Sequence, residues 1–72
     1  MYTIRKDIFA VKQKYEKKWM YVFMTTNKKM AFNKFKEIET DRSIGIIRKA
    51  KVVNPSQRIV DLFLVVGNKI YK

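Results

Sequence analysis

Residues 17–38 read KKWMYVFMTTNKKMAFNKFKEI and decide the fold, because their pattern changes from that of a strand to that of a helix. Residues 19–24 combine aromatic and β-branched side chains with methionine, and such residues suit a pleated surface. The TTN at 25–27 can end this strand and cap a helix, since a short side-chain oxygen accepts hydrogen bonds from the first N–H groups of a helix. From Lys28 the apolar residues recur with helical spacing, which predicts a helix over 28–40 with one buried face.

Strands are also predicted on both sides of this stretch. Residues 2–15 are expected to form a first strand, of which 8–11 is the most apolar part. The lysine-rich segment that follows leads directly into the next strand, so we expect an antiparallel hairpin with its turn near 15–17. Residues 46–53 predict a third strand, and the polar residues on both faces at its centre indicate an edge position.

The last third of the chain contains two turn signals. The NPSQ at 54–57 predicts a turn, because proline presets φ and the flanking Asn and Ser bond their own backbone. Residues 58–66 are apolar on both faces apart from Asp61, which is typical of a central strand. The GN at 67–68 predicts a two-residue hairpin turn into a short last strand at 69–72.

These elements predict one α+β domain over residues 1–72, in the order β-β-α-β-β-β. We expect an antiparallel sheet of four to five strands with one helix packed on one face. In this arrangement Phe35 and Ile38 should be buried against the strand at 58–66. A chain of 72 residues buries only about 60% of the surface that its unfolded form exposes, so a homodimer is one way to gain further burial.

The composition excludes several kinds of chemistry. The chain has no cysteine and no histidine, which removes disulfides, the usual zinc ligands and the commonest general bases and nucleophiles. Its six carboxylates are spread along the sequence, and its two glycines form no phosphate-binding loop. We therefore expect a protein that is not an enzyme and that holds no metal or other cofactor. The longest apolar run, 62–66, is too short to cross a membrane, and we expect a cytoplasmic location.

The charge of the chain points to a polyanionic partner. Lysine and arginine number 17 against 6 acidic residues, giving a formal net charge of +11. Such a potential favours nucleic acid, either DNA or RNA, although a lysine-rich coat that only keeps the protein soluble is the alternative. Lysine outnumbers arginine, and it binds phosphate as a point charge without the planar fork that reads guanine. We therefore expect contacts to the phosphate backbone with little base specificity.

Two basic clusters are the candidate nucleic-acid-binding sites. The first lies around the first hairpin and ends next to an aromatic residue, and the second lies on the later basic strand and its neighbour: Lys12, Lys14, Lys17, Lys18 and Trp19; Arg48, Lys49, Lys51 and Arg58. The basic strand could equally serve to prevent edge-to-edge aggregation.

The aromatic residues of the strand at 19–24 allow two interpretations. Strict alternation puts Trp19, Tyr21 and Phe23 on one face, where they could form a platform for stacked bases. The alternative is that these large side chains supply the core and the methionines between them face outward.

A second function of a different class remains open. The chain could be a small protein-interaction or modulator protein, such as a phage-like accessory protein. It would then bind a host or partner protein through its sheet face or its edge.

Overall fold

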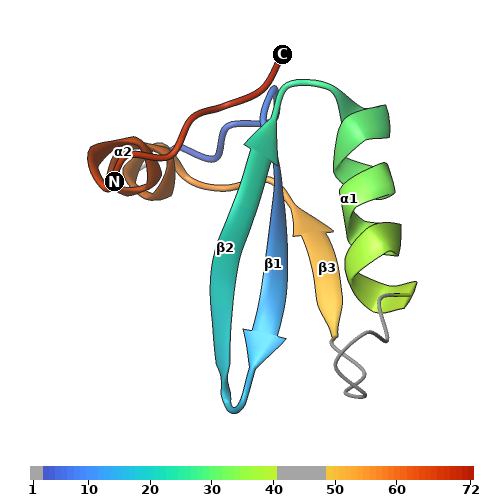
Figure 1. Cartoon of the computed structure of the whole chain (residues 1–72). Helices are drawn as coiled ribbons and strands as arrows, with labels where there is room; N and C mark the ends of the chain where they lie inside the picture. The colour runs from blue at the N-terminus through green and yellow to red at the C-terminus, as the bar shows by residue number, and fades with distance from the viewer. Residues whose placement is uncertain (1–2, 41–48) are drawn as a thin grey trace.

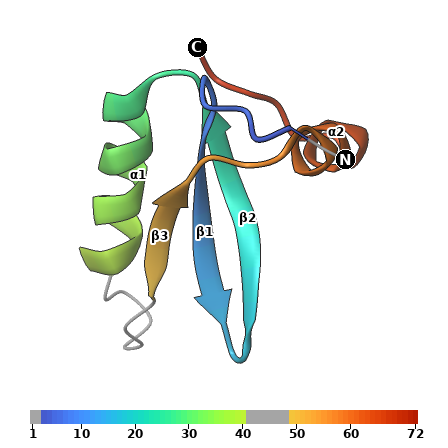
Figure 2. The ribbon, with the colours of Figure 1, turned by 180° about the vertical axis from the view of Figure 1, so that it is seen from behind.

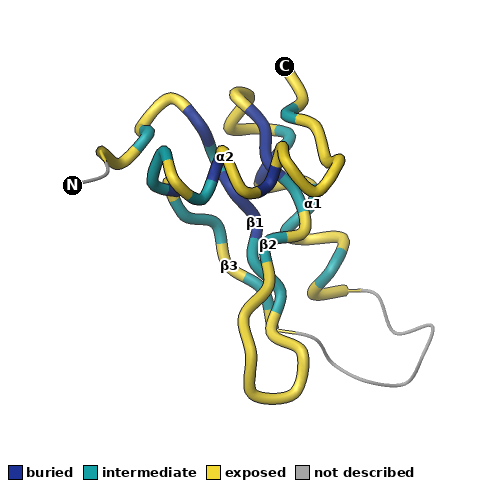
Figure 3. Tube along the Cα trace, turned by 90° about the vertical axis from the view of Figure 1, so that its left-hand side faces the viewer, coloured by how far each residue is buried: buried dark blue, intermediate teal, exposed yellow. Residues whose placement is uncertain are grey.

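The computed structural model describes residues 3–40 and 49–72, which form an α+β structure. The elements follow in the order β1 (Phe9–Tyr15), β2 (Lys18–Thr25), α1 (Lys28–Thr40), β3 (Ala50–Val53) and α2 (Gln57–Val65) (Figure 1). The three strands form an antiparallel sheet in the order β2-β1-β3, so β1 is central and β3 lies at an edge as predicted. Helix α1 lies against one face of the sheet, and α2 crosses one end of the opposite face (Figures 1 and 3).

The predicted first hairpin is confirmed, and it contains an irregularity that the sequence does not announce. Tyr15 pairs with Lys18 across the turn, where Glu16 has a φ of 57°. Further along, Val11 pairs with Phe23 while the next residue of β1 pairs with Tyr21, which leaves Val22 as the extra residue of a β-bulge. The bulge changes which face each later residue of β2 occupies, because alternation restarts after it.

The predicted helix over 28–40 and its cap are also confirmed. The Oδ1 atom of Asn27 accepts hydrogen bonds from the N–H groups of Lys29 at 3.0 Å and Met30 at 3.3 Å. The hydroxyl of the fully buried Thr25 accepts from the Asn27 N–H at 3.0 Å and donates to the Tyr71 carbonyl at 2.8 Å. Residues 25–27 therefore end the strand and start the helix as the sequence indicates.

The predicted central strand at 58–66 is wrong, because this segment belongs to helix α2. Ser56 is the N-cap, and its hydroxyl accepts a hydrogen bond from the Ile59 N–H at 3.4 Å, so the expected turn at 54–57 instead leads into the helix. Val60 and Phe63, three residues apart, are buried, whereas Leu62 is exposed. This spacing is helical, and an apolar segment of nine residues fits a short helix as well as a strand covered on both sides.

The predicted final hairpin is wrong as well. Gly67 follows the helix with a φ of +96°, the left-handed conformation common after helix ends, so GN at 67–68 does not connect two strands. The C-terminal residues run back to the end of β2 (Figure 2), where Tyr71 forms a single parallel bridge with Thr25. Within the described ranges the sheet thus has three strands and the fold two helices, instead of four to five strands and one helix. The part of the predicted third strand at 46–48 lies outside the described residues.

The buried side chains form a group on each side of the sheet. Where α2 packs on the sheet, five buried residues form a cluster with four half-buried neighbours packed against it: Ile8, Ala10, Met24, Val60 and Phe63; Tyr21, Val53, Ile59 and Ile70. Toward α1, Val11 and Ala31 are fully buried. Phe35 and Ile38 are only half-buried on α1, which contacts the three strands, so the expectation that they pack against residues 58–66 is wrong.

Candidate nucleic-acid interface

The face of the sheet that α2 crosses is apolar at one end and basic at the other. Successive side chains of a strand point to opposite faces, so Lys12 and Lys14 share the face of the buried Ala10. On the neighbouring strands, Lys51 lies directly opposite Lys12, and Trp19 lies directly opposite Lys14. Figure 3 shows that α2 covers the upper end of this face, while the hairpin end is exposed.

One further lysine continues the row at the edge of the sheet. Lys49 precedes β3 and lies beside Lys14, whose N–H donates a hydrogen bond to the Lys49 carbonyl at 2.8 Å. Because Lys49 is two residues before Lys51, alternation places both on the same side of the sheet. We call this set the lysine face: Lys12, Lys14, Trp19, Lys49 and Lys51.

Two of these ammonium groups lie over aromatic rings. The Nζ of Lys51 lies 4.5 Å from the ring centroid of Trp19, which it reaches across the central strand. The Nζ of Lys12 lies 4.8 Å from the ring centroid of Tyr21, directly opposite in the hairpin. Each contact is worth about 0.5–1 kcal/mol at an exposed site, and both keep a positive charge close to the surface of the sheet.

The pairing of the lysines introduces a repulsion between strands, which the two cation–π contacts offset in part. Like charges directly opposite one another in a sheet are destabilising, yet Lys12 faces Lys51 and Lys14 lies beside Lys49. Prevention of edge-to-edge aggregation does not explain Lys12 and Lys14, because β1 is the central strand. Within residues 3–40 and 49–72, the ion pairs of Arg5 with Asp7 and of Lys34 with Glu37 involve no lysine of this face, and no carboxylate of these residues forms an ion pair with the lysine face.

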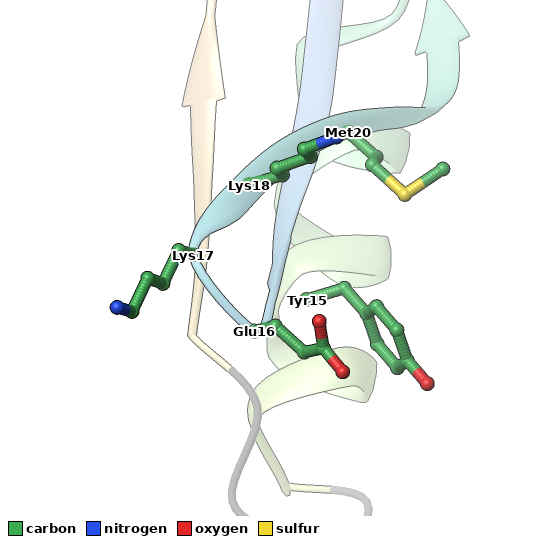
Figure 4. A pocket seen from close by; sticks show the side chains of 5 residues that line it. All are labelled: Tyr15, Glu16, Lys17, Lys18 and Met20. Atoms are coloured by element: carbon green, nitrogen blue, oxygen red, sulfur yellow. The ribbon is translucent and has the colours of Figure 1, made fainter.

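The structure divides the first predicted cluster. Lys12, Lys14 and Trp19 come together, whereas Lys17 is in the hairpin turn. Lys18 pairs with Tyr15, and alternation puts both on the α1 side of the sheet. Around the turn, five residues line a shallow hollow, from which the Lys17 side chain points away (Figure 4): Tyr15, Glu16, Lys17, Lys18 and Met20.

The second predicted cluster is also divided. Lys49 and Lys51 join the lysine face, whereas Arg58 is exposed on α2 and Arg48 lies outside the described residues. What sequence reasoning missed is that parts of the two clusters meet across β1. No local signal could have shown this, because it depends on the pairing of β1 with β3.

The three aromatic residues of β2 were expected to share one face, but the structure separates them. Trp19 and Tyr21 do, but the bulge at Val22 turns Phe23 toward α1, where its ring stacks on Tyr71 at 5.1 Å and lies 5.9 Å from the Lys34 ammonium. Tyr21 is half-buried against the residues under α2, whereas Trp19 is 37% exposed. The two methionines of this strand differ as well, since Met24 is fully buried and Met20 is 54% exposed. The aromatic residues are therefore neither all in the core nor all on one exposed face.

In the described part of the chain, no three of the His, Cys, Asp and Glu residues gather where they could hold a metal ion. The Arg5 guanidinium donates to Asp7 at 2.8 and 2.9 Å, and this hydrogen bonding lowers the pKa of the Asp7 carboxyl below its ordinary value.

None of the described helices has the length and apolar character needed to span a membrane.

Comparison of the chain with protein-family models, with curated proteins and with solved structures gives no match.

Proposed function

We propose that this protein is a non-enzymatic nucleic-acid-binding module whose lysine face contacts the phosphate backbone. The observation that supports this most strongly is the direct opposition of Lys12 and Lys51 on neighbouring strands. An arrangement that costs stability in the free protein becomes favourable when a polyanion lies across it, because phosphates replace the repulsion with attraction.

The chemistry of the face favours phosphates over base edges. Its charged groups are all lysines, and a lysine ammonium binds phosphate as a point charge without the geometric match that distinguishes bases. The formal net charge of +11 adds a long-range attraction that speeds encounter with a polyanion. Binding should therefore depend strongly on salt and weakly on sequence.

Paired charge reversals test this function. The first variant carries Lys14→Glu and Lys49→Glu on the lysine face, and the matched control carries Lys29→Glu and Lys36→Glu on α1. All four side chains are exposed, and both variants lower the formal net charge of +11 by four. In fluorescence anisotropy with a labelled oligonucleotide, the first variant should lose more than about tenfold in affinity and the control much less.

Circular dichroism establishes that both variants are folded. Equal losses from the two pairs would leave only a diffuse positive coat and refute the assignment of the lysine face. No binding by the unaltered protein at low salt would refute the function itself.

A second candidate function is binding to another protein, which the exposed side of α2 and its C-terminal end favour. Here Val65 is 80% and Leu62 is 52% exposed, and Val66 directly after the helix is 73% exposed. A partner captured from nuclease-treated lysate, and lost on Leu62→Lys substitution, would support this function. Loss of the captured material on nuclease treatment would instead favour nucleic acid.

A further inference from the structure

We propose that the ligand of the lysine face is a single-stranded nucleic acid, one base of which stacks on the ring of Trp19. This inference rests on the proposed function, because it specifies the form of the nucleic acid bound at the same surface. It concerns single strands of either DNA or RNA, whose bases all present a flat face.

The position of Trp19 is the first argument. It is the single tryptophan of the chain, and its pairing with Lys14 places it toward the hairpin end of the sheet, with 37% of its surface exposed. Tyr21, the neighbouring ring on this face, packs against the residues under α2 and is less accessible. Aromatic side chains that stand on an antiparallel sheet are a common platform for unstacked bases.

The second argument is the arrangement of positive charge around this ring. The Lys51 ammonium lies 4.5 Å from its centroid, and Lys14 is its direct cross-strand partner. A nucleotide presents a flat base and a charged phosphate close together, and this surface offers a ring and ammonium groups close together. The flexible Lys51 side chain can leave the ring for a phosphate, which exposes the ring to a base.

A duplex can contact the lysines of this surface but cannot stack a base on Trp19 without being distorted. Its phosphates are accessible, but each base face is covered by the neighbouring base pairs, and access to it requires unstacking. A single strand can present phosphates to the lysines and a base to Trp19 together. Loss of one such stack weakens binding by about 5- to 150-fold.

The test uses three labelled ligands with the full chain. These are an oligothymidine, an abasic oligomer with the same number of phosphates, and a duplex of equal length. We expect oligothymidine to bind most tightly and to quench the Trp19 emission. Trp19→Leu should weaken binding to oligothymidine by about 5- to 150-fold and leave the other two affinities unchanged, whereas Trp19→Phe should recover most of the loss.

Tyr15→Leu is the matched control, since Tyr15 is 61% exposed near the same hairpin turn but on the other side of the sheet. It should change none of the three affinities. Equal binding of single strand and duplex with no effect of Trp19→Leu would overturn the stacking proposal and leave the proposed function standing. Equal weakening of all three ligands by Trp19→Leu would overturn it too, as the ring would then only position the lysines. Failure of all three ligands to bind the unaltered protein would refute both.

Discussion

Neutralising two lysines of the lysine face should lower the salt dependence of nucleic-acid binding by a calculable amount. The face holds Lys12, Lys14, Lys49 and Lys51, and we assign one phosphate to each. For a single strand, log K falls against log salt with a slope of about −0.7 per neutralised phosphate, which gives about −2.8 for four. The variant Lys14→Gln/Lys51→Gln removes two contacts, so its slope should be about −1.4.

The assay is fluorescence anisotropy titration of a labelled oligonucleotide between about 50 and 200 mM NaCl. The control variant, Lys29→Gln/Lys36→Gln, removes the same charge from the exposed surface of α1. Its slope should stay near that of the unaltered protein, because charges separated by more than about 8–10 Å from the phosphates are largely screened. Equal changes of slope in both variants would refute the localisation of phosphate contacts to the lysine face. A slope near zero for the unaltered protein would refute phosphate contacts altogether.

Three further predictions concern the scaffold. Met24→Ala should destabilise the fold by about 2–5 kcal/mol in urea unfolding, because Met24 is fully buried, and Phe35→Ala should cost less, because Phe35 is half-buried. Asn27→Ala should cost about 0.5–2 kcal/mol in the same assay and lower the helical circular dichroism signal, because α1 would lose its cap. The pKa of Asp7 is lowered from its ordinary 3.8 mainly by its hydrogen bonds from Arg5, so the stability that it contributes is present above pH 3.8 and lost as the pH falls further. The melting temperatures of Asp7→Asn and the unaltered protein should therefore converge in acid, and a constant difference would contradict this role.

The part of the fold that the sequence predicts well is governed by local interactions. The strand at 18–25, the cap at Asn27 and the helix at 28–40 follow from side chains that act on their own neighbours. The hairpin of β1 and β2 follows from two strand patterns joined by a short polar segment. In each case the chemistry that fixes the structure lies within a few residues of the element that it fixes.

The segment at 57–65 could not be assigned in the same way. Its residues QRIVDLFLV are rich in β-branched and apolar types, and a run of nine suits either a short helix or a buried strand. The distinguishing feature is Ser56, which caps the helix, but its neighbours Asn54 and Pro55 are equally typical of a turn. The choice is made by packing, because Val60 and Phe63 reach the same core only in a helix.

The sequence predicted which types of residue form the candidate site, but not which individual residues belong to it. A run of lysines in sequence alternates between the faces of a hairpin, so Lys17 and Lys18 leave the surface that Lys14 occupies. Conversely, Lys12 and Lys51 are far apart in sequence and become direct neighbours through the pairing of β1 with β3. The bulge at Val22 was likewise not predictable from the sequence, because no glycine or proline marks it.

The boundary between the core and the lysine face follows from the dimensions of α2. This helix runs across the strands (Figure 3), so it covers a length of strand equal to its own diameter, about 10 Å. At about 3.3 Å per residue this is roughly three residues of β1, whereas the seven residues from Phe9 to Tyr15 extend about 23 Å. Ala10 falls under the helix and is fully buried, while Lys14, four residues further, is exposed. The uncovered length must be polar in a free domain, but polarity alone would be satisfied by threonine or serine without any repulsion between strands. Folding therefore does not require opposed lysines there, and the polyanionic ligand that we propose would give them a role.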